Sequence, residues 1–180
     1  RARKEAAYFD GRQFAARNLY WKNYVINASG VLFRRQYALN LVESDFIRMR
    51  CCGDWLFWFQ MALQGGVGMI YRNLNYFRQH TAKVTVASTR SGESIREGLQ
   101  VVQKMEKELP LLKEYKKRLC RGRFYRRIKR SSLSEECKEE LFDELSAVLG
   151  GTVAGYRLER LNQFLRVLNP FILTPGRDRL

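Results

Sequence analysis

The side chain best suited to acid–base chemistry is the carboxylate of Asp54, at the entrance of the most apolar stretch of the chain, C-C-G-D-W-L-F-W-F-Q (51–60). A charge beside two tryptophans and two phenylalanines is costly to remove from water. Its presence at this place therefore suggests that the protein uses it. Asp54 can be an N-cap for the next helical turn, or a general base that the helix start holds in an apolar pocket. The spacing alone favours the cap, and one carboxylate can serve in both roles.

A second candidate is His80, the only histidine in the sequence, which stands two residues after Arg78 in R-Q-H. A single histidine is more often structural than functional. A guanidinium and an imidazole at the end of a strand nevertheless suit a phosphate group, or a metal held by phosphate oxygens. The small side chains of N-A-S-G (27–30) leave room for a ligand near the backbone, although a kink in a strand explains them equally well.

Short strands and one buried helix are expected to position these residues. The stretch 54–63 is apolar nearly all round, which predicts a buried helix that Gly65-Gly66 ends. The β-branched and aromatic residues of 24–33 flank a small polar centre and predict two strands around a kink. A helix over 11–22 and a strand over 67–71 complete this part.

The second half of the chain has a helical pattern. Apolar residues recur at spacings of three and four, and Ser94 with Glu97 and Ser132 with Glu135 form candidate capping boxes. Gly122 is a weak point in this pattern. We expect four helices, over about 94–109, 112–130, 135–148 and 154–168.

The sequence therefore predicts two parts, a domain portion over 1–88 and a basic helical extension over 89–180. The expected class is α/β, or α+β for the isolated chain. An apolar fraction of 46% supports a folded core. No apolar run is long enough for a transmembrane helix, and no signal-peptide core follows R-A-R-K-E-A. The four cysteines stand at no metal-ligand spacing, so reduced thiols of a cytosolic protein are expected.

The net charge of +15 indicates an anionic partner, and the stretch 113–130 supplies +9 of it, with ten Lys or Arg and one Glu. A solvated helix face is the simplest interpretation. Apolar residues among the charges, such as Leu119 and Phe124, also suit an amphipathic helix on an anionic membrane, where each cation adds about 1 kcal/mol. The candidate anion-binding residues are Lys116, Lys117, Arg118, Arg121, Arg123, Arg126, Arg127, Lys129 and Arg130.

Two other function classes stay open for this helical part. The charge and the aromatic residues fit a nucleic-acid-binding module, but the sequence contains no zinc-ligand spacing, no RNP-like strand and no recognisable helix-turn-helix. A helical interaction module without enzymatic activity is the third alternative. The order of the motifs in the first part favours an enzyme.

Three stretches carry that order: N-Y-V-I-N-A-S-G-V-L-F-R-R (23–35), C-C-G-D-W-L-F-W-F-Q-M-A-L-Q-G-G-V-G-M-I-Y (51–71) and L-N-Y-F-R-Q-H (74–80). Together they resemble the C-terminal half of family 2 glycosyltransferases with the GT-A fold, over roughly residues 8–86. The resemblance implies an inverting transfer of a sugar from a nucleotide-sugar donor to an acceptor hydroxyl, on a glycan or a lipid-linked glycan of the cell envelope.

The resemblance also implies roles for single residues. Asp54 would be the catalytic base, and Asn27, Ser29, Gly30 and Trp55 would form the acceptor site. Arg78 and His80 would bind the diphosphate, with His80 as a metal ligand.

The chain departs from the family in two places. Gly53 stands where the family usually has a glutamate. The nucleotide-binding half is missing, because no two of the five aspartates are spaced as Asp-x-Asp. We therefore expect an inactive fragment that holds no metal by itself, whereas the complete enzyme would use Mg²⁺ or Mn²⁺. Its expected place is the cytoplasm, peripherally at the inner face of the cell membrane.

Overall fold

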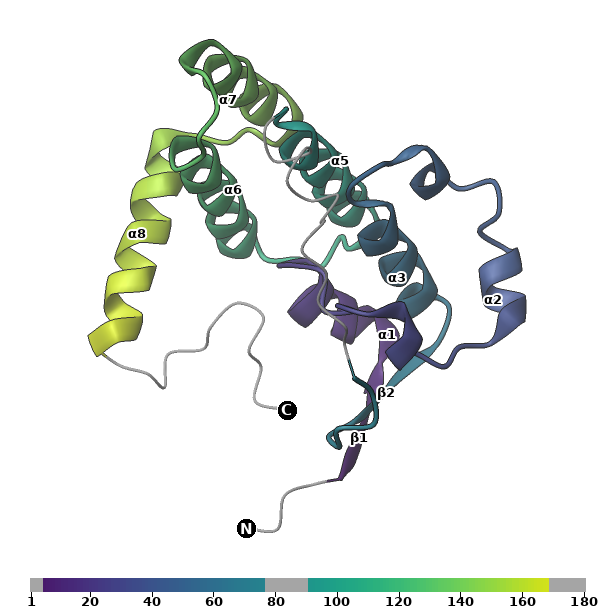
Figure 1. Cartoon of the computed structure of the whole chain (residues 1–180). Helices are drawn as coiled ribbons and strands as arrows, with labels where there is room; N and C mark the ends of the chain where they lie inside the picture. Colours follow the sequence, from purple (N-terminus) through teal and green to yellow (C-terminus); the bar gives the residue numbers. More distant parts are fainter. Residues whose placement is uncertain (1–4, 77–90, 169–180) are drawn as a thin grey trace. The chain divides into compact units, whose positions relative to one another are not determined.

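The computed structural model describes residues 5–76 and 91–168, and these two ranges belong to two compact units (Figure 1). The described part of the first unit combines a small sheet with short helices, and that of the second consists of four longer helices. The α+β class is thereby confirmed. The predicted boundary at residue 88 lies outside the described residues.

A two-stranded antiparallel sheet joins the beginning and the end of the described part of the first unit. β1 (Ala6–Asp10) pairs with β2 (Gly66–Ile70), with Asp10 opposite Gly66. β2 confirms the strand predicted over 67–71. β1 was not predicted from the sequence, because five residues beginning Ala-Ala give only a weak strand signal.

The buried helix predicted over 54–63 is present as α3 (Gly53–Leu63). Its N-cap is Cys52, so the prediction that Asp54 caps it is wrong, and Asp54 lies in the first turn instead. Each large side chain buried in this core contributes about 1.5–3 kcal/mol. The buried apolar residues of the unit are Phe14, Ala15, Leu19, Tyr20, Trp21, Trp55, Leu56, Trp58, Phe59 and Ala62.

The helix predicted over 11–22 is present as α1 (Gly11–Phe14) followed by a π-helical turn (Ala15–Leu19), and both pack on α3. The close approach of α1 to the end of α3 depends on Gly11. A β carbon at this position would overlap the carbonyl oxygen of Ala62, so a larger residue does not fit.

The two strands predicted over 24–33 are not formed. Ala28–Gly30 make a 3₁₀ turn, and residues 31–34 continue without a paired strand among the described residues. β-Branched residues favour a strand only where a neighbouring strand can bond their backbone groups, and β1 and β2 bond each other. The chain returns to α3 through α2 (Arg35–Leu39) and a second 3₁₀ turn (Asp45–Arg48).

The second unit contains the four predicted helices: α5 (Glu93–Glu108), α6 (Glu114–Lys129), α7 (Glu135–Leu149) and α8 (Val153–Leu168). α6 packs against both α7 and α8, and α5 packs against α7 (Figure 1). The side chains that fill this core most completely are Leu99, Val101, Val102, Met105, Ile128, Leu141 and Leu145.

The helix starts of this unit differ from the predicted capping boxes. α7 is capped by Ser134, whose Oγ accepts a hydrogen bond from the N–H of Cys137 at 3.3 Å. α5 begins after Gly92, which has a φ of 71°. The predicted caps at Ser94 and Ser132 are therefore wrong.

Gly122 is the contact point between α6 and α8, not a weak point of α6. The helix continues through it without a break, and the residue is buried. A β carbon at Gly122 would overlap the backbone carbonyl of Gly155 on α8. The missing side chain thus allows the two helix backbones to approach closely.

Candidate functional site

The carboxylate of Asp54 is exposed and held by two hydrogen bonds. Oδ2 accepts from the side-chain amide of Asn23 at 2.9 Å, and Oδ1 accepts from the backbone N–H of Trp55 at 2.7 Å. Its place in the first turn of α3 puts the negative charge at the positive end of the helix dipole. Asp54 is therefore fixed in position but open to an incoming hydroxyl group.

Asn23 is oriented in turn by its own loop. Its Oδ1 accepts from the backbone N–H of Val25 at 3.0 Å, so the amide nitrogen is the group that faces Asp54. Asn23 was not predicted to have a role, although it is the first residue of the motif that includes N-A-S-G. A contact across 31 residues of chain leaves no signal in local spacing.

The aromatic residue after Asp54 faces the core. Trp55 is 8% exposed, and its indole N–H donates to the carbonyl oxygen of Leu19 at 2.7 Å. The apolar pocket expected around Asp54 is absent at this exposed carboxylate. Trp55 anchors the first turn of α3 and does not form a wall that an acceptor can reach in this structure.

The N-A-S-G loop is a tight turn on the surface. Oδ1 of Asn27 accepts from the N–H of Ser29 at 3.0 Å. A β carbon on Gly30 would lie 3.3 Å from the side-chain nitrogen of Asn75. The loop is thus next to the start of the third motif (74–80), to which Asn75 belongs. Arg78 and His80 themselves lie outside the described residues.

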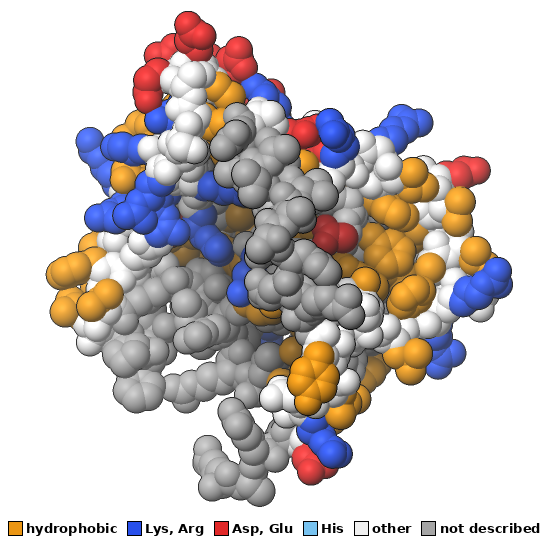
Figure 2. Space-filling view, viewed as in Figure 1, with side chains coloured by type: hydrophobic (Ala, Val, Ile, Leu, Met, Phe, Trp, Pro, Cys, Tyr) orange, Lys and Arg blue, Asp and Glu red, His pale blue; other side chains and the backbone are white. Residues whose placement is uncertain are grey.

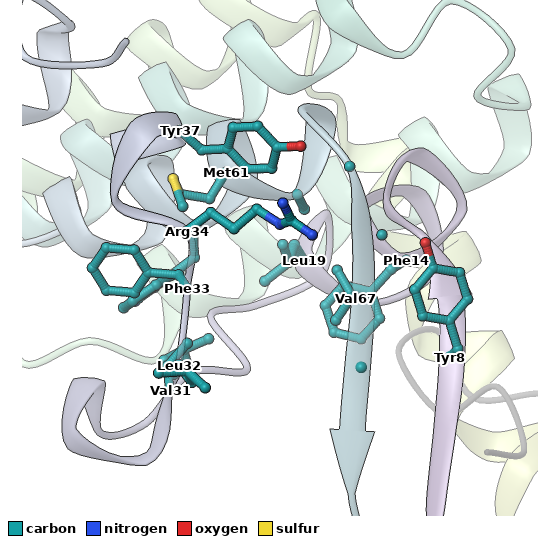
Figure 3. Close-up of a pocket in the computed structure, with 16 residues that line it drawn as sticks. Tyr8, Phe14, Leu19, Val31, Leu32, Phe33, Arg34, Tyr37, Met61 and Val67 are labelled. Atoms are coloured by element: carbon teal, nitrogen blue, oxygen red, sulfur yellow. The ribbon is translucent and has the colours of Figure 1, made fainter. Parts of the chain in front are cut away.

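A cavity of about 520 Å³ lies in the first unit, between the segment 31–34, α3 and β2 (Figure 3). This volume is in the range of small-molecule sites. Among the described residues of its lining, Arg34 is the only charged one, and its side chain extends into the cavity. Tyr8 and Tyr37 add hydroxyl groups to a lining that is otherwise mostly apolar.

Asp54 does not line this cavity, but α3 links the two features. Trp58, one turn after Asp54, contributes to the lining and packs edge-on against Phe33, with ring centroids 5.8 Å apart. Arg34 and Tyr37 were not predicted as site residues, because local spacing in the R-R-Q-Y stretch (34–37) does not mark them.

The apolar side chains that suggested an interfacial helix lie inside the second unit. Leu119, Phe124 and Ile128 are at most 7% exposed, and Tyr125 stacks on Phe142 with centroids 4.4 Å apart. These groups are not available for insertion into a bilayer. Tyr115, at the start of α6, is 53% exposed. The buried groups therefore argue against an interfacial α6, and an anionic partner for its cations stays a prediction.

Several candidate cations of α6 are engaged within the bundle. The ion pairs are Arg118–Glu114 at 3.8 Å, Arg121–Glu106 at 3.0 Å and Arg126–Glu159 at 3.6 Å. These contacts reduce the unpaired charge that the sequence suggested.

The other candidates differ in exposure. Arg127 donates to Oγ of Ser94 at 3.0 Å, and the ammonium of Lys129 lies 5.4 Å from the ring centroid of Tyr156. The remaining candidates are the half-buried Lys116, Lys117 and Arg123 and the exposed Arg130.

Arg96 joins α5 to α7 by donating to Glu140 at 2.7 Å and to Glu144 at 3.1 Å. Burial lowers the pKa of Arg96, but the two carboxylates, Glu144 foremost, more than offset this effect and raise it above its usual value. The guanidinium is charged in any case at ordinary pH, so these ion pairs are structural.

Comparison with family models, with curated proteins and with solved structures gave no match to this chain. No described helix has the length and apolar character needed to cross a membrane. Across residues 5–76 and 91–168, no three His, Cys, Asp or Glu side chains come together as a metal site. His80, the metal ligand that the resemblance implies, lies outside the described residues, so the metal stays a prediction.

Proposed function

We propose that the chain is the acceptor-side part of an inverting family 2 glycosyltransferase, with Asp54 as its general base. The observation that carries the proposal is the exposed Asp54 carboxylate, fixed by Asn23 and by the Trp55 N–H at the start of α3. A base must reach the proton that it removes. Exposure combined with a fixed position suits this role better than burial.

In the proposed reaction, a hydroxyl oxygen of a glycan or lipid-linked acceptor attacks the anomeric carbon of a nucleotide sugar. The new C–O bond forms while the bond to the diphosphate breaks, and its electron pair leaves with the nucleoside diphosphate. Asp54 takes the hydroxyl proton, and the amide of Asn23 keeps the carboxylate oriented. General-base catalysis of this kind contributes about 10²–10⁴-fold. No step is assigned to a metal.

The surface of the first unit supports the proposal that it belongs to a larger domain. Residues 31–34 have no paired strand within the described part of the chain, and Leu32 among them is completely exposed. Ile26, Leu74 and Tyr76 are also at least two-thirds exposed. A neighbouring strand of a nucleotide-binding half would bond the backbone groups and cover such side chains.

The proposal is tested by sugar transfer from a panel of labelled nucleotide sugars, with a longer gene product that contains this chain. We expect transfer by the longer product and none by the isolated chain. Failure of every donor, together with nucleic-acid binding that weakens steeply with salt, would favour the nucleic-acid-binding alternative instead.

A further inference from the structure

α8 carries an apolar face that stays exposed among the described residues of its unit. Leu158, Leu161, Leu165 and Leu168 follow one another at spacings of three and four residues, so they share one side of the helix. They are between 37% and 66% exposed, and Phe164 beside them is 60% exposed. Apolar side chains gathered in this way mark an interaction surface.

The opposite side of α8 packs on α6 and contains the only acidic residue of the helix. Gly155 and Glu159 are buried there, and Glu159 accepts a hydrogen bond from Gln163 and pairs with Arg126. The negative charge of α8 is thus enclosed in the bundle. It does not contribute to the outer face.

The charged side chains described on the exposed surface of α8 are Arg157 and Arg160. Figure 2 shows hydrophobic side chains grouped over the end of α8 beside Lys and Arg side chains, whereas Asp and Glu gather over α7. Leucine and phenylalanine together with arginine on the exposed side of one helix is a composition typical of helices that lie in a membrane interface.

We infer that this face, formed by Leu158, Leu161, Phe164, Leu165 and Leu168 with Arg157 and Arg160, docks on an anionic lipid surface. The leucines enter the boundary between headgroups and acyl chains, and the arginines extend to lipid phosphates. A second copy joined through α8 would offer these arginines no exposed acidic side chain from the described part of that helix, because Glu159 is buried. The membrane contact is thereby assigned to α8 and not to α6. This inference does not depend on the glycosyltransferase proposal.

Flotation of the full chain with vesicles tests this inference. Vesicles of phosphatidylcholine mixed with phosphatidylglycerol are compared with pure phosphatidylcholine at low and high salt. We expect binding to the anionic vesicles only, weaker at high salt. The double variant Leu161→Glu/Leu165→Glu should bind at least about tenfold more weakly, because it removes apolar contact and adds negative charge.

The matched control is Leu111→Glu, which changes a 95% exposed leucine of the same unit outside α8. It should bind like the unchanged chain, and circular dichroism should show the helices intact in both variants. Absence of binding to anionic vesicles, or equal binding of the α8 variant and the control, would overturn the inference. A dimer that the α8 variant dissociates, with no vesicle binding, would instead identify a second copy as the occupant.

Discussion

The side-chain amide of Asn23 donates a hydrogen bond of 2.9 Å to Oδ2 of Asp54 and joins the loop before N-A-S-G to the first turn of α3. Asn23 is therefore a positioning residue for the proposed base. Nothing in local sequence spacing indicates this contact. The contact gives Asn23 a function that can be tested.

In the longer enzyme proposed above, Asn23→Ala should lower kcat by roughly tenfold to a hundredfold, since a hydrogen bond to a charged group contributes about 1.5–3 kcal/mol. The KM for the donor should change little. The matched control is Asn40→Ala, which removes a side-chain hydrogen bond of 3.1 Å to Gln64 at the other end of α3. Equal losses of kcat in the two variants would indicate a general effect on α3 and contradict the positioning role.

Gly11→Ala should destabilise the first unit by about 1–3 kcal/mol or more, because the added methyl group overlaps the carbonyl of Ala62. Gly68→Ala, whose β carbon would meet no atom within 4 Å, serves as the control and should be neutral or slightly stabilising. Urea unfolding followed by tryptophan fluorescence measures both. Equal midpoints for the two variants would show that α1 does not pack on α3 as described.

The α6–α8 contact predicts a similar contrast in the second unit. Gly122→Ala gains about 1 kcal/mol of helix propensity but forces the two backbones apart, so we expect a net loss of stability. Gly155→Ala places its methyl group 3.3 Å from the carbonyl of Arg118, a tight but tolerable contact, and should be close to neutral. Thermal unfolding monitored by circular dichroism compares them, and a stabilised Gly122→Ala would contradict the packing.

The buried Glu159 makes its partner Arg126 important for stability. Arg126→Met leaves this carboxylate, 4% exposed, without its cation and should cost on the order of 3 kcal/mol. The double variant Arg126→Met/Glu159→Met should recover much of the loss, because no unpaired charge is left. Arg118→Met, which removes a more exposed pair at 3.8 Å, is the control and should cost less than about 1 kcal/mol. A double variant as unstable as Arg126→Met would argue against an ion pair between Arg126 and Glu159.

The sequence predicts the helices of this protein better than its strands. Apolar residues spaced three and four positions apart, together with helix stops at Pro110 and Gly150, were enough to predict the four helices described in the second unit. The segment 24–33 was wrongly predicted as strands, because β-propensity does not reveal whether a partner strand exists. Ser134 was missed as a cap because Ser132 offered the same signal two residues earlier.

For the candidate site, the sequence identified the residue types but not their surroundings. Asp54 was expected in an apolar pocket from its neighbours in the chain. A helix, however, directs successive residues to different sides, so Trp55 points to the core while Asp54 is exposed. Arg34 and Tyr37 line one cavity with residues of β2 only through tertiary packing, which local patterns do not encode.

The kcat of the Asp54→Asn variant of the longer enzyme tests the central claim most directly. The substitution keeps size and shape but removes the basic oxygen, so kcat should fall by about 10²–10⁴-fold while donor binding and the unfolding midpoint stay unchanged. Asp45→Asn, at another exposed aspartate of the same unit, should retain full turnover. An Asp54→Asn enzyme as active as the Asp45→Asn enzyme would contradict the assignment of Asp54 as the base.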